Sequence, residues 1–207
     1  MIRHALRTAS VFAVGLAASL AAVTAAPQAR APLGINTGRI TINGTSNIHE
    51  YTASTTTVRV TRAQMATSVP GPAFWDAILK PGALEAFEIA IPATTLHSPK
   101  DGLDKNMYKA LKTDEHADIT FRLVRVEPRA GAGALRAIGV LKIAGVEREV
   151  PLDITTERKD ATLTVRGEVQ LLMTDFGIAP PKAMLGMLKT DPKVKVTFET
   201  VLAVPLT

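Results

Sequence analysis

The side chains best suited to bind a metal are three histidines spread widely along the chain. His49, His97 and His116 are separated by 48 and 19 residues, whereas the histidines of a local site usually lie about three to five residues apart. The chain has no Cys to complete a zinc-type ligand set. The sequence therefore predicts no metal site and no cofactor.

Hydrolytic chemistry has equally little support. Ser46, Ser54 and Ser98 stand in no G-x-S-x-G turn, the context that exposes a nucleophilic serine. Asp153 and Asp160 could act as an acid–base pair on a sugar, but no apolar pocket or aromatic platform accompanies them, since aromatic residues are only 4% of the chain. The sequence predicts a protein that is not an enzyme.

The N-terminus has the pattern of a secretory signal peptide. Arg3 and Arg7 precede the apolar stretch Val11 to Val23, which is followed by small residues. An apolar stretch of this length is shorter than the ~20 residues that a membrane-spanning helix needs. We expect residues 1–25 to be removed, with cleavage near Ala25 or Ala26, no transmembrane span afterwards, and a periplasmic protein.

The charge pattern argues against nucleic acid as a partner. The formal charge of +5 falls to +3 once residues 1–25 are removed, because they carry two Arg and no acidic residue. The remaining Lys and Arg are interspersed with carboxylates, which indicates a solvated surface rather than a basic stripe. Without Cys there is neither a disulfide nor a lipid-modified cysteine, so stability must come from one buried core.

Alternating apolar and polar residues dominate the chain after a Pro- and Gly-containing segment at 26–38, which we expect to be flexible. Period-two alternation is typical of strands with one buried face. It predicts one domain over 39–207 with eight strands. These are expected at 40–42, 49–62, 87–91, 119–124, 135–143, 146–156, 163–173 and 193–202.

Two helices interrupt the strands. Phe74 to Lys80 is a short amphipathic turn that Pro81 stops. Asp101 to Lys112 is a longer helix, with Asp101 as the expected N-cap and an apolar face that includes Met107 and Leu111. An antiparallel sheet of eight strands loses both edges when it closes. The fold predicted is all-β, an eight-stranded antiparallel lipocalin-like barrel capped by the second helix.

Four segments resemble a known family. They are Ile89-Ala-Ile-Pro-Ala-Thr-Thr-Leu-His-Ser98, the helix from Asp104 to Lys112 with Ile119-Thr-Phe121, the hairpin from Gly139 to Leu152, and Thr174-Asp-Phe-Gly-Ile178 with the strand from Val194 to Phe198. In this order they resemble the YceI-like family of exported barrels that bind lipids or polyisoprenoids. The likeness covers about residues 39 to 204 and implies a barrel that encloses a long apolar tail.

The inward-facing apolar side chains admit two interpretations from the residues alone: they fill the barrel, or they line a tunnel. The resemblance favours the tunnel and implies an isoprenoid or fatty-acyl ligand. Tyr108 or His97 would then meet the ligand's headgroup at the mouth. The candidate ligand-binding residues are Phe87, Ile89, Ile91, Met107, Tyr108, Leu111, Phe121, Leu123, Leu141, Val165, Val169, Leu171, Met173, Phe176, Val196 and Phe198.

The function predicted is non-catalytic sequestration or transport of that lipid. The alternative is an interaction module of the cell envelope with a packed core, which supports a membrane partner such as a redox protein. A homodimer stays open under either interpretation. A hollow interior would favour the carrier, and a packed interior would favour the module.

Overall fold

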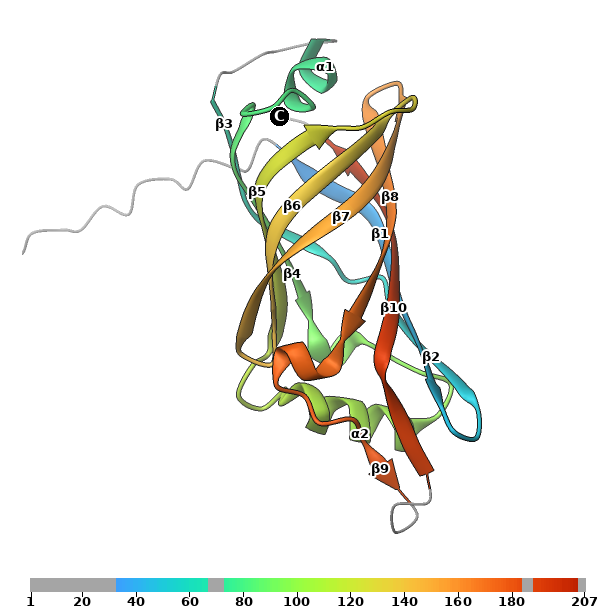
Figure 1. The fold of residues 1–207 in the computed structure, drawn as a ribbon. Helices are drawn as coiled ribbons and strands as arrows, with labels where there is room; N and C mark the ends of the chain where they lie inside the picture. The colour runs from blue at the N-terminus through green and yellow to red at the C-terminus, as the bar shows by residue number, and fades with distance from the viewer. Residues whose placement is uncertain (1–32, 67–72, 184–187, 205–207) are drawn as a thin grey trace, which may run out of the picture.

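The computed structural model describes residues 33–66, 73–183 and 188–204, without the side chains of 182, 183 and 188. The predicted signal peptide lies outside these residues. The described chain forms a curled antiparallel sheet with two α-helices (Figure 1). The strands are β1 (Gly34–Ser46), β2 (Glu50–Thr55), β3 (Arg59–Met65), β4 (Leu84–Pro92), β5 (Asp118–Pro128), β6 (Ala134–Ile143), β7 (Val146–Lys159), β8 (Thr162–Leu172), β9 (Lys182–Ala183) and β10 (Leu188–Ala203).

The sheet runs in the order β2-β1-β10-β8-β7-β6-β5-β4-β3, with the short β9 paired to the end of β10. The all-β, barrel-like fold is therefore confirmed, but the count of eight strands is wrong, because nine strands form the main path. The predicted strand 49–62 is two strands. β2 pairs with β1, and β3 pairs with β4 at the other edge of the sheet. β1 also begins at Gly34, inside the segment expected to be flexible.

The two edges of the sheet meet at a seam that the chain itself crosses. Residues 56–58 carry the backbone directly from β2 to β3. Beside this crossing, the backbone of Ser54 exchanges two hydrogen bonds with the backbone of His97, at 2.8 and 2.9 Å. The hydroxyls of Thr55 and Thr95 lie 2.7 Å apart. Side-chain and main-chain bonds therefore hold this part of the seam in place of a continuous ladder.

A helix lies at each end of the curled sheet (Figure 1). At one end, α1 (Phe74–Ile78) buries Phe74, Trp75 and Ile78 against a cluster that includes Leu33 and Leu163. At the other end lies α2 (Asp101–Leu111), which confirms the predicted cap. None of the described helices is long and apolar enough to cross a membrane.

Candidate functional site

The interior of the barrel holds an apolar cavity. Its volume is ≈ 230 Å³, and its lining comes from β1, the strands β4 to β8, β10 and helix α1, together with Leu33, Leu79 and Leu96 outside these elements. Only Thr156 and Thr200 among the lining residues carry a polar side chain. Because side chains alternate across each strand, the apolar residues at every second position face this space while their polar neighbours face solvent. A space lined in this way suits apolar groups and offers water few hydrogen-bond partners.

Most of the predicted ligand-binding residues meet at this cavity. The sheet brings together side chains from strands far apart in sequence, and those predicted from the sequence that line the cavity are Phe87, Ile89, Ile91, Phe121, Leu123, Leu141, Val165, Val169, Leu171, Val196 and Phe198. The alternation within each strand placed them on the inner face.

Five predicted residues lie outside the cavity wall. Met107 and Leu111 pack from α2 against the cluster at the end of the barrel. Met173 and Phe176 belong to a separate cluster beside the short 3-10 helix η3 (Met173–Phe176). The hydroxyl of Tyr108 bonds to backbone carbonyls instead. The predicted strand 163–173 ends one residue early, because η3 begins at Met173 and places this side chain outside the cavity wall.

Sequence reasoning missed the contribution of the α1 end. Leu33, just before β1, and Ile35 at its start line the cavity, and Ile78 and Leu79 line it from the C-terminal end of α1. Leu33 and Ile35 belong to the segment 26–38 that the sequence predicts to be flexible, and the short helix predicted at 74–80 has no predicted role in the cavity. The signal available was the apolar pair Ile78-Leu79 before Pro81, which predicts a buried helix end.

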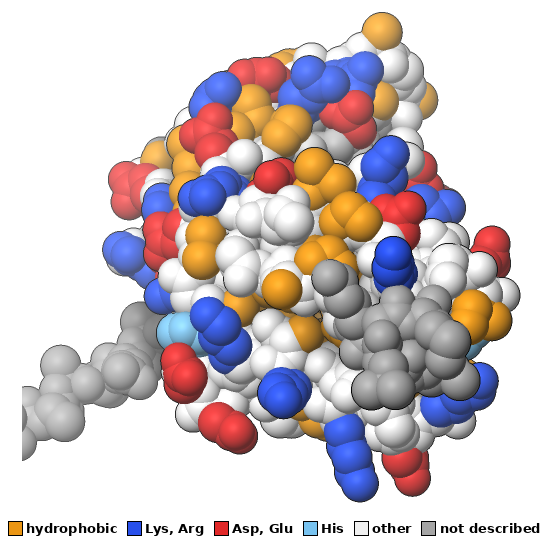
Figure 2. All heavy atoms as spheres, turned by 60° about the horizontal axis from the view of Figure 1, so that its bottom comes forward, with side chains coloured by type: hydrophobic (Ala, Val, Ile, Leu, Met, Phe, Trp, Pro, Cys, Tyr) orange, Lys and Arg blue, Asp and Glu red, His pale blue; other side chains and the backbone are white. Residues whose placement is uncertain are grey.

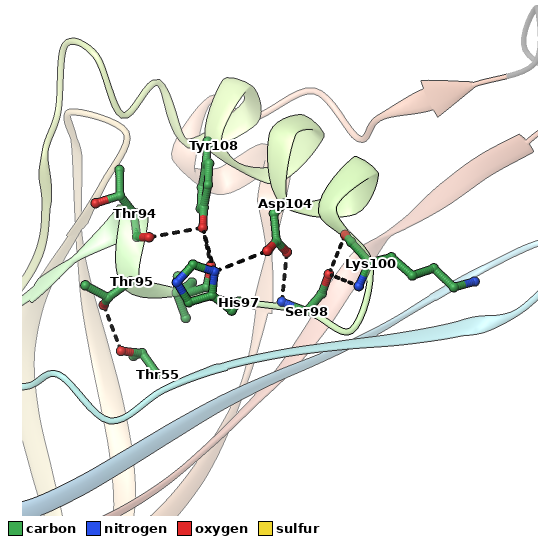
Figure 3. Close-up of polar contacts among 9 residues, drawn as sticks. Thr55, Thr94, Thr95, His97, Ser98, Lys100, Asp104 and Tyr108 are labelled. Carbon is green, nitrogen blue, oxygen red and sulfur yellow. Dashed lines mark hydrogen bonds and ion pairs between the residues drawn. The ribbon is translucent and has the colours of Figure 1, made fainter.

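A group of polar contacts anchors α2 at the other end (Figure 3). The backbone N–H of Ser98 donates to Asp104 Oδ1 at 2.8 Å, and His97 Nδ1 lies 3.2 Å from Asp104 Oδ2. The Tyr108 hydroxyl donates to the carbonyl of Leu96 at 2.7 Å. Asp101 was expected to cap the helix, but it is the first helical residue, and Lys100 is the N-cap without a side-chain bond. The buried carboxylate that reaches back toward the preceding loop is Asp104.

Electrostatics at this anchor favour a charged Asp104. Burial alone would raise the pKa of the carboxyl, but hydrogen bonds from Ser98 and His97 outweigh burial and bring the pKa below its ordinary value. Burial and the nearby Asp104 charge raise the pKa of Tyr108, so its hydroxyl stays a neutral donor. Asp104 and Tyr108 therefore serve as an acceptor and a donor that fix α2.

The neighbours Ser98, His97 and Asp104 suggest a hydrolytic triad, but the geometry does not form one. A nucleophilic hydroxyl must bond to its base, whereas the Ser98 hydroxyl donates to the carbonyl of Lys100 at 2.9 Å. His97 Nδ1 lies 3.2 Å from the Tyr108 hydroxyl. No group of three or more potential metal ligands gathers in the described part of the chain.

The surface around the α2 end is of mixed charge (Figure 2). Lys and Arg side chains are interspersed with Asp and Glu over this face, and hydrophobic side chains show between them. The imidazole of His97 is 68% exposed here, above an Asp104 side chain that is only 11% exposed. This face thus presents polar groups to solvent while the cavity behind it is apolar.

Comparison with known proteins agrees with this architecture. The sequence profile of the YceI-like domain matches residues 36–202. The chain belongs to this family. No curated protein matched the sequence.

Two solved structures share the fold of this YceI-like domain at low sequence identity. BcnA of Burkholderia cenocepacia is 14% identical, with a TM-score of 0.62 over 80% of this chain and 96% of its own. A polyisoprenoid binding domain from Saccharophagus degradans, implicated in plant cell wall breakdown, is 12% identical, with a TM-score of 0.63 over 85% of this chain and 100% of its own. Likeness at this level of identity shows the fold.

Proposed function

We propose that this protein binds the apolar tail of an isoprenoid or another long-chain lipid inside its barrel and sequesters or transports it. The observation that carries the proposal is the cavity of ≈ 230 Å³ whose lining is apolar except for Thr156 and Thr200. The fold that it shares with a polyisoprenoid binding domain supports the same conclusion. The alternative, an interaction module with a packed core, would have no such space.

The size of the cavity suits a slender ligand. Pockets for drug-sized molecules usually measure about 300–1,000 Å³, and this one is smaller but extends from Ile78 at α1 to Leu96 near α2. Burying a methylene group gains about 0.8 kcal/mol, so a tail of about ten such groups would gain about 8 kcal/mol before the cost of association. A longer tail that also contacts the barrel end would reach micromolar affinity.

The polar anchor at the α2 end is the proposed position of the headgroup. His97 is exposed there, and Tyr108 lies beside it with its hydroxyl bound to the Leu96 carbonyl. Leu96 lines the cavity, so a tail in the lumen would end next to these two side chains. Met107 and Leu111 would act in this proposal as the apolar underside of a lid.

Binding of this kind requires no covalent step. The proposal therefore assigns no catalytic residue. It also includes a periplasmic location, which the signal-peptide pattern of the N-terminus predicts. A homodimer or a membrane redox partner is not needed for it.

Native mass spectrometry of the mature protein, exported in cells and purified without detergent, tests the proposal. We expect an adduct of several hundred daltons that organic solvent extracts as an isoprenoid or fatty-acyl species. A bare polypeptide mass that does not change after incubation with isoprenoid quinones, isoprenoid alcohols and fatty acids would refute it.

A further inference from the structure

Two glycines interrupt the rows of apolar side chains on the inner wall. Gly139 lies between Ala137 and Leu141 on β6, both of which line the cavity. Gly167 lies between Val165 and Val169 on β8, which line it as well. Alternation places each glycine on the inner face of its strand, so at two points the wall has no side chain of its own.

A phenylalanine ring covers each of these glycines. A Cβ atom at Gly167 would lie 2.6 Å from Phe198 Cζ, and one at Gly139 would lie 2.5 Å from Phe121 Cε2. Phe198 is directly opposite Gly167 in the β10–β8 register, and Phe121 is diagonal to Gly139 across β5 and β6. Rings can pack this closely on a strand only where the neighbour is glycine.

The two pairs flank the same strand. Gly167 pairs with Ile154 and Gly139 pairs with Val150, both on β7. The rings of Phe121 and Phe198 therefore approach β7 from opposite sides while both line the cavity. Each ring has the wall behind it, so the space available to a displaced ring is the lumen.

We propose that Gly139 and Gly167 set the bore of the cavity, by letting two phenylalanine rings rest on the wall, and thereby select single slender tails over ligands with fused rings. This inference rests on the proposed function. It assigns the choice of ligand class to residues that present no side chain to the ligand.

A matched control exists in the same sheet. A Cβ atom at Gly44 would collide with the ring of Tyr51 on the neighbouring strand, but neither residue lines the cavity. Gly44→Ala therefore displaces an aromatic ring from a glycine, as Gly167→Ala does, without changing the bore. At Gly167 the added Cβ atom would also lie 2.9 Å from the Asp153 carbonyl oxygen.

The test measures the affinities of farnesol, geranylgeraniol, palmitic acid and cholesterol for the lipid-free mature protein and its variants. We expect wild type to bind the slender probes and to exclude cholesterol. Gly167→Ala should weaken geranylgeraniol binding at least ten-fold, whereas Gly44→Ala should stay within two-fold of wild type. Phe198→Ala should admit cholesterol, and Gly167→Ala with Phe198→Leu should recover most of the lost affinity.

The results distinguish a failure of this inference from a failure of the proposed function. If wild type binds none of the probes, the proposed function fails. If wild type binds slender tails but Gly167→Ala resembles Gly44→Ala, or Phe198→Ala still excludes cholesterol, the inference alone is overturned. Should Gly167→Ala not fold, the cholesterol result for Phe198→Ala decides.

Discussion

Replacing Asp104 by alanine should weaken the docking of α2 in a measurable way. The carboxylate accepts the Ser98 backbone N–H at 2.8 Å from a buried position, and a hydrogen bond to a charged group contributes about 1.5–3 kcal/mol. The contact with the exposed His97 ring adds little, because solvent screens it. We expect the free energy of unfolding to fall by about 2 kcal/mol, measured in urea as a lower midpoint with an unchanged m-value.

The matched control is Asp101→Ala in the same first turn. Asp101 is exposed in the first turn of α2, where its charge favours the positive end of the helix dipole, so its removal should cost less than about 1 kcal/mol. The folded-state pKa of Asp104 is lowered, so its charge stabilises the fold fully above the unfolded pKa of about 3.9 and loses this effect as the pH falls through the folded pKa. The difference in free energy of unfolding between wild type and Asp104→Asn should therefore shrink below about pH 4. Equal losses for Asp101→Ala and Asp104→Ala, or a gap that persists unchanged to pH 3, would refute the reasoning.

Three further substitutions probe the ends and the wall of the barrel. Tyr108→Phe keeps the ring but removes the bond to the Leu96 carbonyl, so unfolding in urea should become easier by about 1 kcal/mol; an unchanged midpoint would mean that the hydroxyl does not anchor α2. Leu171 lines the cavity whereas its neighbour Leu172 is 39% exposed. Leu171→Asn should abolish binding of a fluorescent fatty acid and cost about 2–3 kcal/mol, while Leu172→Asn should leave both unchanged, and similar effects from the two would contradict the assigned faces. Trp75 is 3% exposed at the α1 end, so Trp75→Ala should lower the free energy of unfolding by about 3–5 kcal/mol, and a loss below about 1 kcal/mol would show that α1 is not part of the core.

The strands were predictable because one face of the sheet is apolar and the other is solvated. One stretch, residues 49–62, departs from this pattern. It is rich in Thr and Val, which favour strands, yet the strand breaks after Thr55, where the Thr55 hydroxyl accepts the backbone N–H of Thr57 at 3.0 Å. A hydroxyl that bonds two residues ahead competes with strand pairing, so the run of threonines held the turn signal. What it could not reveal is that the chain turns there to join the two edges of the sheet.

The site was predictable along the strands and unpredictable at their ends. Alternation placed residues such as Leu141 and Val169 on the cavity wall. It could not say that η3 turns Met173 away, since that depends on where a ladder stops. Nor could it pair Phe198 with Gly167, because the contact joins two strands whose register only the folded sheet defines.

The register between β1 and β10 places the two ends of the domain side by side, because Gly34 pairs with Ala203. A short linker could therefore join these ends, and the chain could be reopened elsewhere as a circular permutant. New ends between Thr56 and Thr57 would leave every ladder of the sheet intact while removing the covalent link across the seam. Such a permutant would separate two roles that the natural chain combines, namely the pairing that builds the wall and the crossing that keeps it closed.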